Sequence, residues 1–186
     1  MASVRNLLLN EPKLFCAAVP TGLQPWFHFL QKEMNIPLVH LQRMVQRNPK
    51  ILMYSLGQNL QPKFLFLILH LKMNDKQILK LLRFFPEWMN YKLHLQISPI
   101  VQFFCQDFEL SPMEVGQMFL KYRKLISHSF VKIKQVVGYL RYELEMDATQ
   151  VKRIFFQASQ AVSLTDDRLI SKVQFVQNDL GFRAPQ

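Results

Sequence analysis

Glycine and cysteine are scarce in this sequence, and no apolar run is long enough to cross a membrane. Only 5 of the 186 residues are glycine, which favours helices over turn-rich folds. The two cysteines, Cys16 and Cys105, cannot build a disulfide framework, so we expect buried, reduced thiols. The longest strongly apolar stretch, residues 64–71, is far shorter than the ~20 residues of a membrane-spanning helix, so we expect no transmembrane segment.

The motifs that signal catalysis or cofactor binding are also missing. No C-x-x-C occurs, and no histidine lies four residues from another histidine or from a cysteine, so we expect no metal site. Phosphate-binding loops, the dinucleotide fingerprint and the nucleophile elbow are absent too. The neighbouring acids Glu143 and Glu145, and Asp166 and Asp167, lie near expected helix ends and are interpreted as caps and solvated loop residues. We therefore expect no enzyme, no cofactor and no small-molecule substrate.

What the chain does contain is apolar residues and positive charge. Apolar residues make up 49% of the chain, which excludes a disordered protein. The 23 basic and 13 acidic residues give a net charge of +10, which favours a polyanionic partner, either nucleic acid or an anionic membrane surface. Residues 1–9 are too short a segment for a secretion signal or an organelle transit peptide. We expect a targeting peptide to be absent, or to have been removed before this numbering begins.

One unit recurs along the chain with a period of 37 residues. A period in this range is the signature of stacked repeats. Taking the first proline of each unit (Pro12, Pro49 and Pro86) as position zero, the series continues at Arg123 and then, after 36 residues, at Ser159. The pairs separated by 37 residues are Pro49 and Pro86, Tyr54 and Tyr91, Pro62 and Pro99, and Phe66 and Phe103.

The apolar positions predict a first helix in every unit. Residues eight, five and four before position zero are apolar in all five units, a spacing that marks one face of an α-helix. We expect N-caps at Asn74 and Asp147. A capping box is expected from Ser111 to Glu114. The apolar positions are Val4, Leu41, Ile78, Val115 and Val151; Leu7, Met44, Leu81, Met118 and Ile154; Leu8, Val45, Leu82, Phe119 and Phe155; and, three after zero, Phe15, Leu52, Met89, Ile126 and Val162.

A short helical turn and a second helix complete the expected unit. Pro25, Pro62 and Pro99 are placed in the first turn of the second helix, where the missing N–H has no cost. The predicted fold class is all-α: a right- or left-handed superhelical solenoid of ~4.5 triple-helical repeats, each with two long helices plus a short helical turn. The repeats have 36–37 residues. Residues 1–182 are expected to form one repeat domain, followed by a frayed tail at 183–186.

The recurrent phrase L-x-x-x-P-x-x-L-x-Y-x-L-x-x-x-L-x-P-K-x-x-F-L resembles the mitochondrial transcription termination factor (mTERF) family. It stands in residues 82–93 and in residues 48–67, whereas the units at Arg123 and Ser159 match by apolar pattern only. The resemblance implies a superhelix that binds nucleic acid in mitochondria or, alternatively, in chloroplasts. It further implies a role in regulation or termination of organelle transcription, or in rRNA handling and ribosome assembly. The expected partners are double-stranded DNA or structured RNA.

Basic side chains recur roughly opposite the apolar face, at positions six, three and two before zero and around zero itself. We expect stacking to align them into a positive stripe that binds phosphates; the alternative is an ordinary solvated face. About 6 contacts to duplex DNA would give a log–log salt slope of about −5, and would supply affinity without sequence choice. Acids at the other end of the first helices complement the helix dipole: Asp75, Glu109, Glu114 and Asp147. The candidate nucleic-acid-binding residues are Arg43, Arg47, Lys50, Lys63, Lys80, Arg83, Lys121, Arg123, Lys124 and Arg153.

Two further features leave alternatives open. Tyr54, Tyr91 and His128 recur five residues after zero; they are either base-stacking platforms or half-buried rings whose polar tips reach water, and we favour the second. The alternative function is a protein-interaction scaffold, such as a subunit of an organelle ribosome or a partner of an RNA-modifying enzyme. Apolar residues expected at the surface near the C-terminus, Phe175 and Phe182, fit that alternative. Membrane binding is not expected, because stacking uses the apolar helix faces.

Overall fold

A computed structural model describes residues 4–158 and 166–181, and within these ranges all regular elements are helical. The predicted all-α class of helical repeats is confirmed. The helices group into two compact units, Met1–Lys92 and Leu93–Gln186. The single domain at residues 1–182 stays a prediction, and the expected tail at 183–186 lies outside the described residues.

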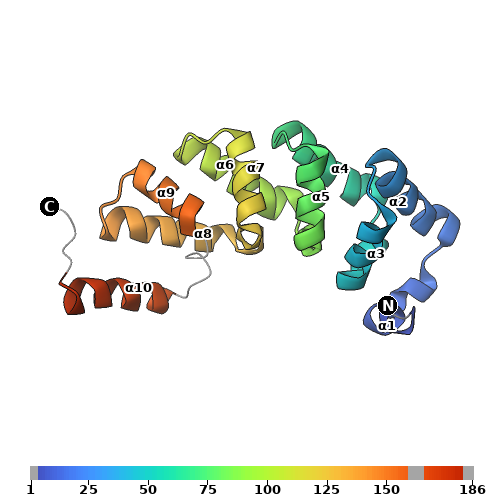
Figure 1. The fold of residues 1–186 in the computed structure, drawn as a ribbon, viewed down its shortest axis with the longest axis horizontal. Coiled ribbons are helices and arrows are strands. Elements are labelled where there is room, and N and C mark those ends of the chain that lie inside the picture. The colour runs from blue at the N-terminus through green and yellow to red at the C-terminus, as the bar shows by residue number, and fades with distance from the viewer. Residues whose placement is uncertain (1–3, 159–165, 182–186) are drawn as a thin grey trace. The chain divides into compact units, whose positions relative to one another are not determined.

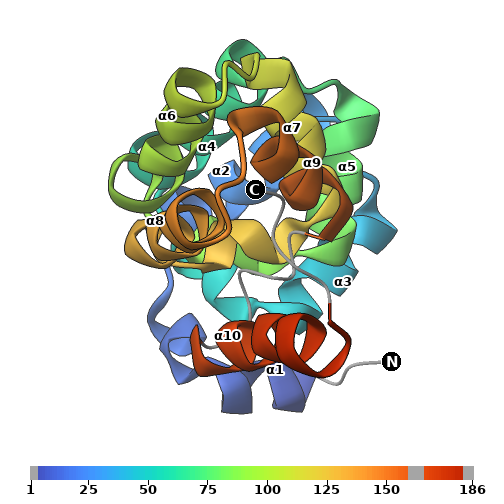
Figure 2. The same ribbon diagram turned by 90° about the vertical axis from the view of Figure 1, so that its left-hand side faces the viewer.

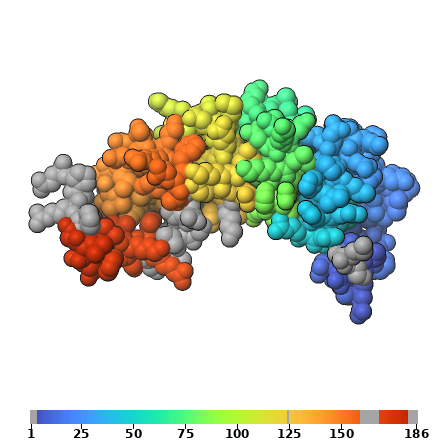
Figure 3. All heavy atoms as spheres, viewed as in Figure 1, coloured from blue at the N-terminus to red at the C-terminus, as the bar shows by residue number. Residues whose placement is uncertain are grey.

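The first unit contains a series of first helices, short turns and second helices, as the repeat predicts. The helix α3 packs against α5, and Figures 1 and 2 show these two in one layer and the second helices α2 and α4 in the other. In the space-filling view the surface from α3 to α5 is continuous (Figure 3). The first helices are α1 (Val4–Asn10), α3 (Leu38–Arg47) and α5 (Asp75–Phe84); the short turns are Pro12–Cys16, Pro49–Met53 and Pro86–Asn90; the second helices comprise Val19–Leu23, α2 (Gln24–His28) and Phe29–Glu33, and then Leu56–Leu60, α4 (Gln61–Leu65) and Phe66–His70.

The second unit continues the same order of elements. The helix α6 packs against both α7 and α8, and Figure 2 shows α6 and α8 on one side and the first helices α7 and α9 on the other. The first helices are α7 (Pro112–Lys121) and α9 (Ala148–Ala158); the short turn is Arg123–Ser127; the second helices comprise Leu93–Ile97 and α6 (Ser98–Asp107), then α8 (Phe130–Gly138) and Tyr139–Glu143, then α10 (Asp166–Gln174) and Phe175–Asp179.

Aromatic rings fill the core of each unit. In the first unit, Phe64 meets Phe29 and Trp88 edge-on, with ring centroids 5.5 and 6.3 Å apart. In the second unit, Phe104 meets Phe155 at 5.2 Å. Such pairs add to the free energy gained from burying the rings themselves. The apolar positions predicted from the repeat are mostly buried in α3, α5, α7 and α9.

The apolar positions of the first repeat are the exception. Val4 is 70% exposed and Phe15 is 75% exposed, although both keep the repeat register. In the described structure no repeat packs on that side of α1 and its turn. The last predicted position, Val162, lies outside the described residues.

The predicted caps are present at the starts of three first helices. Asn74 and Ser111 each form a reciprocal capping box, the first with Gln77 and the second with Glu114. Asp147 accepts from the backbone N–H of Gln150 at 2.8 Å, while the Gln150 side chain accepts from the Asp147 N–H at 3.0 Å. These bonds satisfy backbone N–H groups that a helix N-terminus leaves unpaired.

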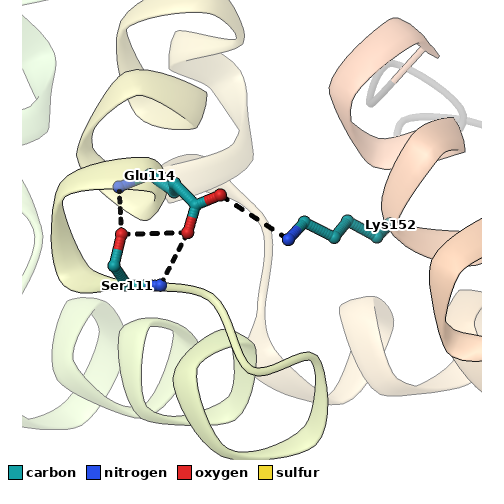
Figure 4. Close-up of polar contacts among 3 residues, drawn as sticks. All are labelled: Ser111, Glu114 and Lys152. Atoms are coloured by element: carbon teal, nitrogen blue, oxygen red, sulfur yellow. Dashed lines mark hydrogen bonds and ion pairs between the residues drawn. The ribbon is translucent and has the colours of Figure 1, made fainter.

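Figure 4 shows how the second of these caps also joins two repeats. The carboxylate of Glu114 accepts from the backbone N–H and the hydroxyl of Ser111, and it lies 3.6 Å from the Lys152 ammonium on α9. The hydrogen bonds from Ser111, followed by the charge of Lys152, lower the pKa of Glu114. The charged form of this carboxylate is therefore the one that the folded second unit favours.

Each second helix ends in a left-handed residue, a feature that the sequence did not reveal. Asn35, Lys72, Glu109 and Glu145 have φ of 50–52°, and Gly181 has φ of 70°. These residues follow one another at intervals of 37, 37, 36 and 36 residues, so the backbone conformation repeats with the same period as the sequence. At the first three positions the next residue is buried and its N–H donates to the preceding helix, from Ile36 to Leu30, from Met73 to Leu67 and from Leu110 to Phe104.

A wide turn at the start of the second helix distinguishes the repeats of 37 residues from the fourth repeat, which has 36. In the first two repeats the regular part of the second helix begins with Pro25 and Pro62 in its first turn, as predicted. However, a wide turn precedes it, in which N–H groups bond to carbonyls five residues back: Leu23 to Ala18 and Leu60 to Ser55. Such a turn adds about one residue and removes the clash that a proline ring makes with an ordinary helical carbonyl.

The second helix of the fourth repeat starts without the proline and without a wide turn, although a wide turn lies at its end, over Tyr139–Glu143. There α8 starts as a regular helix capped by Ser129, whose hydroxyl accepts from the Lys132 N–H at 3.2 Å. The distance from the helix start to its left-handed residue falls from 16 residues (Val19 to Asn35) to 15 (Phe130 to Glu145). The residue missing from the 36-residue repeat is therefore the one that the wide turn accommodates.

Candidate nucleic-acid interface

The first unit brings four of the candidate basic residues to one face of its first helices. Arg43 and Arg47 lie one turn apart on α3, and Lys80 and Arg83 lie one turn apart on α5. All four side chains are exposed, because the opposite sides of both helices supply the buried core. A spacing of three or four residues puts each pair on the same side of its helix.

The three arginines among these four residues converge on one hollow. Arg43, Arg47 and Arg83 line a surface hollow of about 330 Å³ together with Gln46 and Phe84. In the described part of the chain, none of the three guanidinium groups forms an ion pair with a carboxylate. Each guanidinium is a permanent cation that binds phosphate through paired N–H donors. The hollow is therefore a concentration of uncompensated positive charge.

Arg47 is held in place by the neighbouring repeat. Its Nη1 donates to the backbone carbonyl of Arg83 at 2.9 Å, in the last turn of α5. That carbonyl belongs to the negative end of the helix dipole, which a cation stabilises. A guanidinium has five N–H donors, so one bond to a carbonyl leaves donors for a ligand. Arg47 therefore joins α3 to α5 and remains able to bind an anion.

The second unit repeats this contact with a different cation. Lys121, at the same position of its repeat, donates from Nζ to the carbonyl of Phe156 at 2.6 Å, and the Tyr122 hydroxyl donates to the same carbonyl at 2.7 Å. Lys121 and Arg153 are exposed, whereas Arg123 is half-buried. The side chain of Lys124 lies outside the described structure. Within this unit, the exposed candidates thus lie on α7 and α9.

Lys63 does not belong to the candidate surface, contrary to the sequence-based expectation. Only 4% of the residue is exposed, and its ammonium donates to the carbonyl of Met89 and, at 2.5 Å, to the side-chain carbonyl of Asn59. The ammonium also lies 5.2 Å from the centroid of the Tyr54 ring. Burial lowers the pKa of Lys63 to about 8. An ammonium enclosed in this way cannot reach a phosphate, whereas Lys50 is exposed in its turn.

The recurring tyrosines have structural contacts. The Tyr54 hydroxyl donates to Oδ1 of Asn90 at 2.6 Å, and Nδ2 of Asn48 donates to the same oxygen at 2.9 Å. The polar tip of Tyr54 therefore meets a side chain of the next repeat, where we expected water. Burial, followed by the charge of Glu11, raises the pKa of Tyr54. Tyr91 stacks on Phe85 at 6.1 Å.

Two residues of the hollow, Gln46 and Phe84, were not predicted from the sequence. Phe84 occupies the position that holds Arg47 and Lys121 in other repeats, and 44% of it is exposed. The guanidinium of Arg83 lies over its ring, 5.3 Å from the centroid. An aromatic residue one turn after Lys80, on a polar helix face, was the available signal in the sequence.

Other kinds of site find little support in the described residues. No group of three or more His, Cys, Asp and Glu side chains there is placed to hold a metal ion. None of the helices in that part of the chain has the length and apolarity needed to cross a membrane. Both cysteines are free, but Cys16 is exposed and Cys105 is half-buried, so the expectation of two buried thiols is wrong. Burial raises the pKa of the Cys105 thiol.

Comparison with known proteins agrees with the arrangement of repeats. The family model named mTERF matches residues 1–183. A search of curated protein sequences found no match to the chain. The family is generally not enzymatic. Because the family model covers nearly the whole chain, the protein belongs to the mTERF family of nucleic-acid-binding helical-repeat proteins of organelles.

Proposed function

We propose that this chain binds nucleic acid through the basic faces of its first helices and acts in organelle transcription, as a regulator or termination factor, or in rRNA and ribosome assembly. The observation that supports this most directly is the convergence of Arg43, Arg47 and Arg83, none of which forms an ion pair with a carboxylate of the described residues. The exposed cations Lys50, Lys80, Lys121 and Arg153 extend the same chemistry within each unit. We propose the mitochondrion as the compartment, with the chloroplast as the alternative.

Phosphate contacts explain affinity in this proposal, but not sequence choice. Each arginine or lysine that meets a phosphate displaces a condensed counterion, so binding should weaken steeply as salt increases. With ~6 contacts to duplex DNA the log–log slope should be about −5. Such contacts position the protein on the phosphate backbone without reading bases.

The test is a charge reversal of the basic face. In the variant Arg43→Glu, Lys80→Glu and Arg83→Glu, we expect nucleic-acid affinity to fall by at least tenfold at moderate salt and the salt slope to become shallower by about 3. The melting temperature should change little, because all three side chains are exposed. Fluorescence anisotropy with labelled DNA and RNA, across a salt series, measures both the affinity and the slope.

A matched control separates the surface from net charge alone. Lys32, Lys72 and Lys76 are also exposed in the first unit but do not line the hollow. Reversing these three lysines to glutamate changes the net charge by the same amount. If the control weakens binding as much as the triple variant does, or if the triple variant binds like the wild type, the proposed face is wrong.

A protein-interaction scaffold is the second candidate, for instance in an organelle ribosome or beside an RNA-modifying enzyme. It is favoured by three exposed apolar residues at the end of the last described helix: Phe175, Val176 and Leu180. The other residue expected there, Phe182, lies outside the described structure. Purification of the native protein with its associated molecules distinguishes the candidates. A stoichiometric protein partner, with no affinity of the purified chain for free nucleic acid, would support the scaffold.

A further inference from the structure

The hollow between the C-terminal ends of α3 and α5 combines cations with an exposed aromatic ring. Arg43, Arg47 and Arg83 supply the positive charge, and Phe84 is the apolar part of the lining. Because the Arg83 guanidinium already lies over the Phe84 ring, the two side chains form one layered, π-rich surface beside the other two arginines. Phosphates alone require the cations but not the ring.

We propose that this hollow binds single-stranded nucleic acid: the arginines hold one backbone phosphate, and the adjoining base stacks on the layered pair of Arg83 and Phe84. The inference rests on the proposed function and adds the class of nucleic acid to it. Bases in a single strand expose their faces and stack on aromatic rings and guanidinium planes. Bases inside a duplex are covered by their neighbours, so a duplex would contact the cations but could not stack a base on the ring.

The geometry fits a group of nucleotide size. A volume of about 330 Å³ lies near the lower end of the range of ~300–1,000 Å³ that is usual for small-molecule sites. The bond from Arg47 to the Arg83 carbonyl fixes one guanidinium before a ligand arrives, which reduces the ordering needed on binding. Gln46 adds an amide that can donate to a phosphate or accept from a base edge.

The experiment compares single strands with duplexes in variants of the full chain. The probes are fluorescein-labelled DNA and RNA single strands of mixed sequence, their duplexes, and a DNA single strand with abasic sites. With Phe84→Ala we expect the affinity for single strands to fall about 5- to 150-fold, the range measured for the loss of one base–aromatic contact. Affinity for the duplexes and the abasic strand should stay unchanged.

Two further variants serve as controls. Phe84→Tyr keeps an aromatic face and should retain the affinity for single strands, whereas Phe84→Leu keeps apolar bulk without the ring and should lose it. Thermal unfolding followed by circular dichroism shows whether each variant is folded. A loss with Phe84→Ala but not with Phe84→Leu would mean that apolar bulk, not stacking, matters, and would overturn the inference.

Failure of this inference is distinguishable from failure of the proposed function. If the charge reversal of Arg43, Lys80 and Arg83 abolishes binding but Phe84→Ala changes neither single-strand nor duplex affinity, the face binds phosphates and the stacking inference is wrong. If Phe84→Ala weakens duplex and single-strand binding equally, the inference is also wrong. If the wild-type chain binds none of the probes, the proposed function fails together with it.

Discussion

Lys63 makes the stability of the first unit depend on pH in an unusual direction. Its ammonium is enclosed by Met89, Asn59 and the ring of Tyr54, and burial lowers its pKa from 10.5 to about 8. Between these values the unfolded chain holds the proton that the folded chain has lost. Stability therefore rises with pH from about 8 to 10.5 and is independent of this group below pH 8. The difference corresponds to about 3 kcal/mol in the free energy of unfolding.

The perturbation that isolates this effect is Lys63→Met, which keeps the length of the side chain and removes the charge. The wild type should gain stability relative to the variant from pH 8 upward, with the gain approaching ~3 kcal/mol near pH 10.5. Both tryptophans of the chain, Trp26 and Trp88, lie in the first unit and are buried, so their fluorescence follows the unfolding of that unit alone. Urea unfolding at a series of pH values gives the free energies.

Two controls complete the measurement. Lys80→Met also removes one positive charge, but from an exposed lysine. The free energy of unfolding of this variant, relative to the wild type, should therefore not change between pH 8 and 10.5 as it does for Lys63→Met. The raised pKa of Tyr54 acts in the opposite direction above pH 10, because the unfolded chain ionises first. Tyr54→Phe in both backgrounds removes that contribution. A difference between wild type and Lys63→Met that stays flat from pH 8 to 10 would refute the reasoning, and would mean that the carbonyl contacts and the ring fully offset burial.

Three further predictions concern the repeat itself. Ser111→Ala should lower the stability of the second unit by ~1 kcal/mol at neutral pH. The wild type should lose part of this advantage as the pH falls through the lowered pKa of Glu114, because the bond from the Ser111 hydroxyl to the carboxylate is the part that titrates; equal acid sensitivity in circular dichroism of both proteins would argue against that bond. Lys72→Gly should raise stability by a few tenths to ~1 kcal/mol, since glycine has no penalty at its φ of 52°; a lower urea midpoint would contradict this. Phe64→Ala should lower it by ~3–5 kcal/mol, seen by tryptophan fluorescence; a smaller loss than for an exposed residue such as Leu65→Ala would show that the ring cluster is not the core.

The helices could be predicted because their signals are local and repeated. The apolar spacing located the first helices, and the caps at Ser111 and Asp147 follow from residue types that accept backbone N–H bonds. The left-handed ends could not be found in the same way, since four of the five hold residues other than glycine. At Lys72 and Glu109 the backbone is set by the burial of the residue that follows, which is a tertiary effect.

The candidate interface was predicted less completely than the fold. Arg43, Arg47 and Arg83 come together because they occupy equivalent faces of packed helices, and the period shows this. Lys63 was misplaced because a lysine gives no sign in sequence that its ammonium will meet a carbonyl of the next repeat. Phe84 was missed because the prediction looked for residue types shared between repeats. An aromatic ring that replaces a cation in one repeat does not appear in such a comparison.

The number of residues in a repeat depends on whether its second helix starts with a wide turn. Because the wide turn adds one residue and accompanies a proline, a single-residue insertion or deletion combined with gain or loss of that proline leaves the following helices in phase. Either event alone would rotate everything downstream by ~100°, turning apolar side chains toward water. Related chains should therefore vary at these two places together, and a 36-residue spacing without the proline identifies a second helix that starts without a wide turn before any coordinates are known.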